Sequence, residues 1–146
     1  MKVLSALLFT SLLITPAIWK TNFNEAKIEA EKNNKFILVN FSGSDWCSPC
    51  IQLRKNIFES ECFAAYAFEN LVLVNADFPR RNKHKLSPDQ KKMNEDLAEK
   101  YNPDGKFPYT ILMTADGKIL KQWDGLPNLS DQQFVDEIKQ TADANR

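Results

Sequence analysis

Little in this sequence points to a disulfide-rich scaffold or to a nucleic-acid-binding protein. Only three of its 146 residues are cysteines, and one pair plus one extra thiol is closer to a catalytic arrangement than to a scaffold. Basic and acidic residues number 19 each, so no charge excess favours nucleic acid. The chain has neither an internal repeat nor a low-complexity linker, and its length suits one domain.

The longest apolar run lies at the N-terminus and is too short for a comfortable membrane span. Lys2 precedes an apolar stretch from Val3 to Ile14, and Thr15-Pro16-Ala17 ends in a small residue. This pattern is typical of a secretory signal peptide cleaved near Ala17, and the alternative is an uncleaved N-terminal anchor. We therefore predict a signal peptide over residues 1–17, one domain over residues 18–146, and a periplasmic or extracellular location.

Hydrophobic patterning predicts an α/β fold. Continuous apolar runs at 36–41 and 71–76 indicate strands that are covered on both faces. Strands at 107–113 and 119–123 flank a hairpin signal, which requires an antiparallel pair, while the β-α-β portion requires a parallel pair. Amphipathic patterns predict helices at 22–34, 48–58, 60–68, 87–101 and beyond 130. We expect a central mixed sheet of four to five strands with helices on both faces, and Met93, Leu97 and Tyr101 as the buried stripe of one helix.

The stretch Asp45-Trp46-Cys47-Ser48-Pro49-Cys50 carries the reactive groups of the candidate site. Two thiols three positions apart, the second in the first turn of a helix, can close a small disulfide. Cys47 stands at the helix N-terminus, where unpaired N–H groups and the helix dipole favour an anion, and Pro49 suits the first turn. Because a thiolate is the nucleophile of disulfide exchange, Cys47 is the candidate nucleophile and Cys50 the resolving thiol. We expect Cys47 to be the more exposed thiol, with a pKa lowered from about 8.5 to between about 3.5 and 7.5.

Two other interpretations of the cysteine pair remain open. It could be a purely structural disulfide, or it could be half of a zinc site. The chain contains no second C-x-x-C, so a closed four-cysteine zinc site cannot form within one chain.

The motif Trp46-Cys47-Ser48-Pro49-Cys50, placed between an apolar strand and a helix, resembles that of the thioredoxin family. The resemblance extends over roughly residues 20–144 and implies the thioredoxin fold. It implies that Phe107-Pro108 is the family's cis-proline position, where the backbone of Phe107 pairs with an extended substrate segment. The alternative is an ordinary trans proline at a strand start. Trp46 is expected to give the partner a flat contact surface, with Ser48 and Pro49 beside it.

The chain departs from the family pattern at the positions that handle protons. Asn40 stands where many thioredoxins have a buried acid, and Leu73 stands where they often have a lysine. Asp45 is expected to be exposed, and it is a candidate proton relay or an aid to solubility. Ser48 replaces a common glycine between the cysteines, at a position that tunes the reduction potential in the family.

Two features lie outside the motif. Arg80, Arg81, Lys83, His84 and Lys85 form a basic stretch, which we interpret as a solvated loop in preference to a patch for nucleic acid or an acidic partner. His84 as a catalytic base or metal ligand is the minor alternative. Cys62 is expected to be a buried, small apolar residue, with a regulatory or intermolecular disulfide as the alternative.

These patterns, together with the resemblance to the thioredoxin family, predict a monomeric thiol–disulfide oxidoreductase that reduces or exchanges disulfides in cell-envelope proteins. We expect no cofactor beyond the Cys47–Cys50 pair, protein thiols and disulfides as partners, and a membrane electron donor. One alternative is a disulfide-introducing oxidase. Another is a non-enzymatic module of the same fold that binds a partner beside Trp46 and Phe107, and a zinc-binding module is the third.

Overall fold

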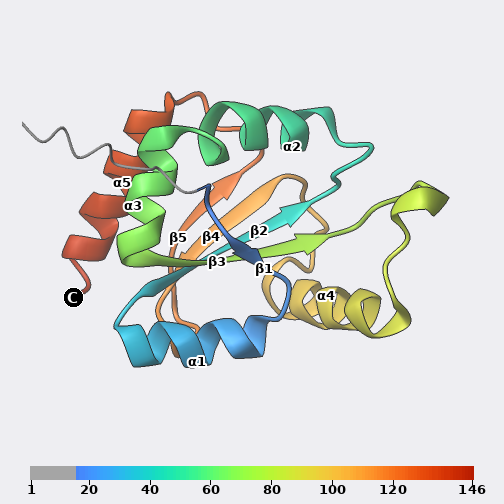
Figure 1. Ribbon diagram of the computed structural model, residues 1–146, viewed down its shortest axis with the longest axis horizontal. Coiled ribbons are helices and arrows are strands. Elements are labelled where there is room, and N and C mark those ends of the chain that lie inside the picture. The colour runs from blue at the N-terminus through green and yellow to red at the C-terminus, as the bar shows by residue number, and fades with distance from the viewer. Residues whose placement is uncertain (1–15) are drawn as a thin grey trace, which may run out of the picture.

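The computed structural model describes residues 16–146 and contains one mixed sheet with the strand order β1-β3-β2-β4-β5 (Figure 1). Strands β1, β3 and β2 are mutually parallel, whereas β4 is antiparallel to β2 and to β5. The strands are β1 (Trp19–Lys20), β2 (Phe36–Ser42), β3 (Leu71–Asp77), β4 (Tyr109–Met113) and β5 (Ile119–Asp124). The predicted mixed sheet is confirmed, but β1 was missed because two residues show no periodicity.

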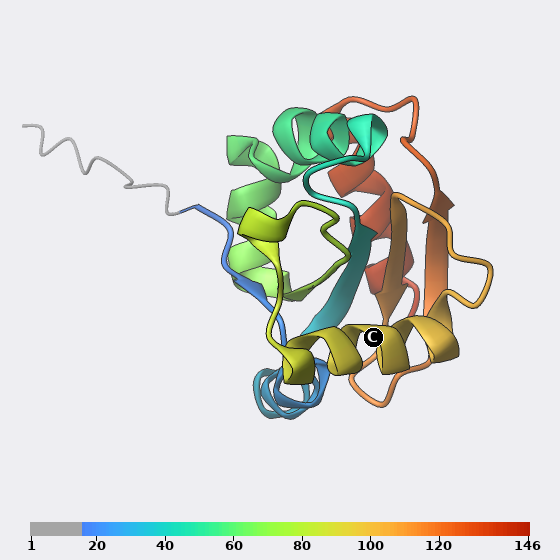
Figure 2. The same ribbon diagram turned by 90° about the vertical axis from the view of Figure 1, so that its right-hand side faces the viewer.

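Helices cover both faces of the sheet (Figure 2). One face carries α1 (Phe23–Asn33) and α4 (Pro88–Tyr101). The other carries α2 (Ser48–Leu53), the π-helical segment η1 (Arg54–Phe58) that continues it, α3 (Glu61–Asn70) and α5 (Asp131–Asp143). A short 3₁₀ turn, η2 (Asn82–His84), lies between β3 and α4. Each predicted helix is present, within a few residues of its expected ends.

The central strand β2 separates two hydrophobic cores, because successive side chains of a strand point to opposite faces. Phe36 and Leu38 join the core under α3 and α5, which also contains Phe134 and Trp123. Ile37, Val39 and Phe41 join the core under α1 and α4. Every residue of β2 is buried, including the polar Asn40 and Ser42, as its largely apolar sequence predicts.

The predicted buried face of α4 is wrong in part. Met93 of α4 is 39% exposed, while its neighbour Asn94 is buried beside Leu97 and Tyr101. The amide Nδ2 of Asn94 donates to the backbone carbonyl of Asp77 at 2.8 Å. A polar residue occupies the core-facing position because it pairs with the end of β3.

The predicted signal peptide at 1–17 lies outside the described residues except for its last two positions. Among residues 16–146, no helix combines the length and apolar character that a membrane crossing requires.

Candidate active site

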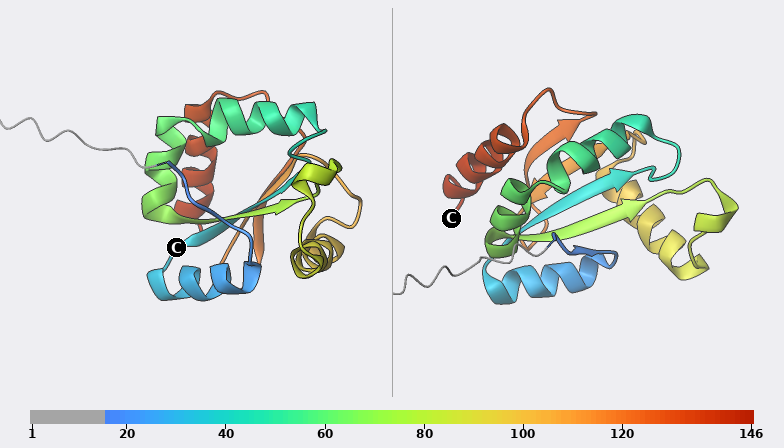
Figure 3. Two further views of the ribbon diagram at one scale, coloured as in Figure 1. Left: turned by 45° about the vertical axis from the view of Figure 1, so that its right-hand side comes forward. Right: turned by 45° about the horizontal axis from the view of Figure 1, so that its top comes forward.

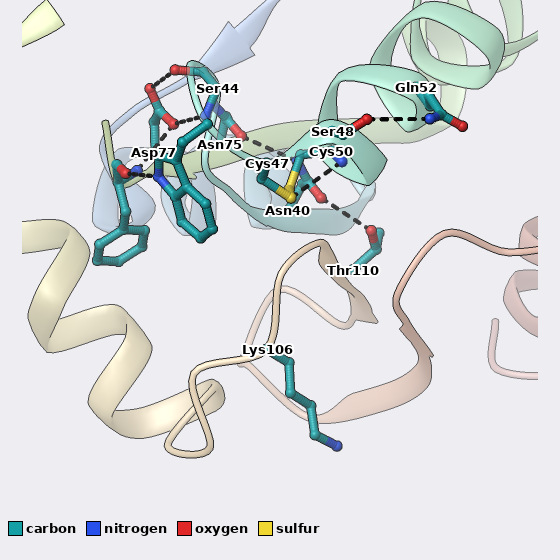
Figure 4. Close-up of a disulfide and its surroundings, with 12 residues drawn as sticks. Asn40, Ser44, Cys47, Ser48, Cys50, Gln52, Asn75, Asp77, Lys106 and Thr110 are labelled. Carbon is teal, nitrogen blue, oxygen red and sulfur yellow. Dashed lines mark hydrogen bonds between the residues drawn. A yellow bond between two sulfur atoms is a disulfide. The ribbon is translucent and has the colours of Figure 1, made fainter. Parts of the chain in front are cut away.

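Cys47 and Cys50 form a disulfide where the loop after β2 enters α2 (Figure 4). Their Cα atoms are 5.3 Å apart. Cys47 is the N-cap of α2, and its Sγ accepts a hydrogen bond from the backbone N–H of Cys50 at 3.3 Å. Pro49 lies in the first helical turn, where its missing N–H leaves no partner unsatisfied. The helix start therefore directs a donor at the Cys47 sulfur, which favours a thiolate there after reduction.

Exposure does not distinguish the two sulfurs in this oxidised form. Cys47 is 5% exposed and Cys50 is 4% exposed, so the expected greater exposure of Cys47 is not observed. Their positions do differ, because Cys47 caps the helix and Cys50 lies inside it. Ser48 and Pro49 between them are exposed, and the Ser48 hydroxyl accepts from the Gln52 side chain at 3.4 Å.

A chain of neutral side chains crosses three strands beneath the disulfide. Asn40 Nδ2 donates to Asn75 Oδ1 at 3.2 Å, and Asn40 Oδ1 accepts from the Thr110 hydroxyl at 3.1 Å (Figure 4). Asn40, Asn75 and Cys50 line a common cavity of about 190 Å³ in which Arg54 is the only charged lining residue. Among the described residues, no carboxylate lines this cavity.

Trp46 is held in place by contacts from distant parts of the chain. Its indole Nε1–H donates to the Phe78 carbonyl at 2.7 Å, and its ring meets the Phe107 ring edge-on at 5.5 Å. The Arg80 guanidinium lies over the indole, 3.7 Å from the ring centroid. The structure thus brings together Trp46 and Phe107, two of the predicted substrate-contact residues.

The Phe107–Pro108 peptide bond is cis, which confirms the expected conformation. Pro108 directly precedes β4, whose first residue, Tyr109, pairs with Phe41 near the end of β2. The Pro108 carbonyl accepts from the Gly125 N–H at 2.9 Å. Pro108 therefore lies at the end of the sheet where β2 leads into the loop before Cys47.

The Asp45 side chain is buried, although it is expected from the sequence to be exposed. It is only 3% exposed, and its two oxygens accept from the backbone N–H groups of Arg80 and Arg81 at 2.9 Å each. His84 Nδ1 lies 3.0 Å from the same carboxylate. The Arg80 N–H is the main cause that lowers the pKa of Asp45 to about 2, with Arg81 and His84 adding to it against the effect of burial. The predicted exposure is wrong, and these contacts favour a structural role over proton relay.

The basic stretch is exposed, as expected of a solvated loop, but its backbone is tied to the motif through Asp45. The segment 78–87, yellow-green in Figure 3, follows β3 and lies beside the loop that leads into α2. A second link joins Asp77 to Ser44, whose backbone N–H donates to the carboxylate at 2.9 Å. Sequence reasoning missed these links, although the parallel pairing of β2 and β3 places the segments that follow them at one edge of the sheet.

Cys62 is half-buried in α3 rather than fully buried, and its thiol donates to Gln132 Oε1 at 3.2 Å. Burial raises the pKa of this thiol, and the neighbouring Asp131 and Asp136 raise it further. Cys62, the thiol outside the disulfide, is therefore not activated as a nucleophile, because a raised pKa disfavours the thiolate.

Comparison with solved structures supports the fold. A structure described as "DsbH Oxidoreductase" superposes with a TM-score of 0.83 at 27% identity, covering 97% of this chain and 95% of that one. A thioredoxin from Thermus thermophilus superposes with a TM-score of 0.63 at 16% identity, over 88% of each chain.

Comparison with curated sequences points the same way. The chain is 33% identical over 102 residues to "Disulfide bond reductase DsbH" of Chlamydia pneumoniae, which covers 70% of this chain and 59% of that protein. It is 33% identical over 61 residues to "Thioredoxin-related protein DsbJ" of the same organism, covering 42% of this chain and 18% of that protein. The chain thus spans less than two thirds of the length of both relatives. A family model for the thioredoxin-like domain matches residues 23–142, and the chain belongs to the thioredoxin-like domain family.

Proposed function

We propose that this protein is a thiol–disulfide oxidoreductase that reduces or exchanges disulfides in cell-envelope proteins through a Cys47/Cys50 dithiol–disulfide cycle. The observation that carries the proposal is the Cys47–Cys50 disulfide at the N-terminus of α2, in a chain of the thioredoxin-like family. A helix N-terminus stabilises a thiolate, and a thiolate is what attacks a disulfide.

In the forward direction, the Cys47 thiolate attacks one sulfur of the substrate disulfide and releases the other as a thiolate. The product is a mixed disulfide between Cys47 and the substrate. Cys50 then loses its proton and attacks the Cys47 sulfur, which closes the Cys47–Cys50 disulfide and releases the second substrate thiol. Two electrons pass from the cysteine pair to the substrate, and the structure corresponds to the oxidised enzyme at the end of this cycle.

Trp46, Phe107 and Pro108 are proposed to contact the substrate beside the disulfide, together with the exposed Ser48 and Pro49. The edge-on contact of Trp46 with Phe107 supports a shared surface. The proposed cycle uses no cofactor beyond the cysteine pair. The protein is proposed to act as a monomer.

Reduction is the favoured direction because the DsbH relative is described as a disulfide bond reductase. The predicted signal peptide supports a location outside the cytoplasm. An oxidising compartment does not resupply electrons, so the cycle would need a membrane donor to restore the dithiol.

The reduction potential of the Cys47–Cys50 pair tests the proposal. We would equilibrate the Cys62→Ala variant in dithiol and glutathione buffers and measure the alkylated fraction. A value near about −270 mV is expected for a reductant, whereas a value near about −120 mV would identify an oxidase. A pair that forms no disulfide in any buffer would contradict enzymatic function altogether.

The Cys47→Ser variant separates an enzyme from a binding module. We expect it to lose turnover of a disulfide substrate, because no nucleophile remains to form the mixed disulfide. Unchanged turnover in this variant would exclude the proposed cycle.

A further inference from the structure

We infer that a groove next to Trp46 binds an acidic, extended segment of the substrate protein, close to the disulfide that the enzyme reduces. This inference rests on the proposed function and adds a substrate class to it. The groove has a volume of about 470 Å³, within the range of about 300–1,000 Å³ that is typical of ligand pockets. We call it the basic groove. Its lining includes Trp46, Phe78, Phe107, Arg80, Arg81 and Lys85.

The charge of the basic groove is strongly unbalanced although the chain as a whole is neutral. Four cationic residues line it, including Lys91, against the single carboxylate of Asp77. Within residues 16–146, no carboxylate lies within ion-pair distance of Arg80, Arg81 or Lys85. Three cations are thus available to an incoming anion.

The nearby carboxylates keep their negative charge, but their oxygens accept from backbone and hydroxyl donors and form no ion pair with the arginine and lysine side chains of the groove. Asp77 accepts from the backbone N–H groups of Ser44 and Phe78 and from the Ser44 hydroxyl. Asp45 accepts from the N–H groups of Arg80 and Arg81. These bonds turn both carboxylates towards the backbone and fix the cationic segment in one conformation. A preorganised site loses less conformational entropy when a ligand binds.

Continuity with the cysteine pair indicates what occupies the groove. Trp46 both lines the groove and directly precedes Cys47, so a segment bound in the groove contacts the residue next to the reactive sulfur. The three aromatic rings offer apolar surface between the cations, which suits a polypeptide with acidic side chains. Nucleic acid is less well matched, because the total charge is zero and the cations form no extended field.

The test compares peptides that contain the same disulfide flanked by Asp and Glu, or by Asn and Gln. We expect a kcat/KM about tenfold higher for the acidic peptide at low salt. The preference should fall below about twofold at about 1 M salt, where the Debye length is about 3 Å. Arg81→Gln with Lys85→Gln should remove most of the preference while the neutral peptide is still reduced. The matched control is Lys32→Gln with Lys139→Gln, which removes two exposed lysines remote from the groove and should retain the full preference.

Binding is measured separately, by calorimetry of a cysteine-free acidic peptide with the full chain carrying Cys47→Ser and Cys50→Ser. If no peptide is reduced but the acidic peptide binds and Arg81→Gln/Lys85→Gln weakens it, the proposed function fails and the groove assignment stands. If both peptides are reduced equally well at low salt, the inference is overturned and the enzyme remains. Salt-sensitive binding of a single-stranded oligonucleotide in place of the peptide would also overturn it.

Discussion

At the residue scale, Gly43 leaves room for the indole ring of Trp46, the residue that precedes Cys47 and lines the basic groove. A Cβ atom at this position would lie 2.3 Å from Trp46 Cε2 and 2.6 Å from Nε1 and Cζ2. Real Cβ atoms do not approach so closely, so the indole would have to move. Movement would break the bond from Nε1 to the Phe78 carbonyl, which joins the motif to the segment after β3.

Gly43→Ala should therefore destabilise the fold by about 1–3 kcal/mol, through overpacking and loss of a hydrogen bond. Urea unfolding measures the free energy, and the NMR signal of the Trp46 indole N–H reports the bond. In a Trp46→Ala background the same substitution should cost much less, because the clash is gone. Equal costs in the two backgrounds would contradict this account.

Asp45 gives the site a pH dependence of defined sign. Its folded-state pKa of about 2 lies below its ordinary value of 3.8, so its contribution to stability is present above about pH 4. That contribution is lost as pH falls towards 2, where the carboxylate becomes protonated in the folded protein. Ionised Asp45 therefore stabilises the link between the motif loop and the basic segment at neutral pH.

Asp45→Asn should be less stable than the parent protein at pH 7, and the difference should shrink between about pH 4 and pH 2. Urea unfolding at a series of pH values measures it. Asp104→Asn is the control, because Asp104 is exposed and should change stability little at any of these pH values. A difference that does not vary with pH would mean that the Asp45 charge is not the stabilising feature.

At the element scale, two parallel strands end together and deliver the two halves of the site. β2 leads into the loop before Cys47, and β3 leads into the basic segment, residues 78–87. Ser42 and Asp77 are paired at the ends of the two strands. The Phe78 N–H then donates to the Ser42 carbonyl at 2.8 Å, which extends the pairing beyond the strands. The carboxyl ends of parallel strands are a common place for binding sites for this reason.

The last helix, α5, depends on a capping box at its start. The Ser130 hydroxyl accepts from the Gln133 N–H at 3.2 Å, and Gln133 Oε1 accepts from the Ser130 N–H at 2.9 Å. Ser130→Ala should cost about 1 kcal/mol, while Ser130→Asp should retain most of the stability. Thermal unfolding with the disulfide intact compares the two variants. Equal loss in both would show that the cap contributes little.

At the scale of the whole molecule, the disulfide sits at one end of a sheet that is stabilised by two separate cores. Phe134 of α5 is fully buried and packs against Trp123, Phe58 and Phe63 at centroid distances of 4.7, 6.0 and 6.4 Å. These rings connect α5, η1 and α3 to the sheet. The π-helical segment η1 contributes Phe58, so the helix that Cys47 caps is anchored in this core.

Phe134→Ala should destabilise the protein by about 3–5 kcal/mol because it leaves a cavity among these rings. Phe68→Ala, in contrast, removes a ring that is 66% exposed and should cost far less. Urea unfolding at constant redox state measures both free energies. A similar cost for the two substitutions would contradict the assignment of the core.

The sequence predicted features that depend on neighbouring residues and missed those that depend on distant ones. The helix that starts at Ser48 and the hairpin between β4 and β5 follow from local signals, and both are present. The exposure of Asp45 was predicted wrongly because its partners lie 35 and 36 residues further along the chain. Met93 was placed inward for a similar reason, since periodicity alone does not reveal that Asn94 pairs with the end of β3.

By itself, the sequence determined the cysteine pair, the helix start that caps it and the buried strand before it, because each depends on the order and spacing of neighbouring residues. The thioredoxin-like fold was implied by the resemblance of the motif to that family. Only the tertiary structure decided that the basic segment faces Trp46 and that Asp45 anchors it. The physical reason is that short-range patterns depend on adjacent residues, whereas the hydrogen-bond donors of a carboxylate can come from any part of the chain that folding brings close to it.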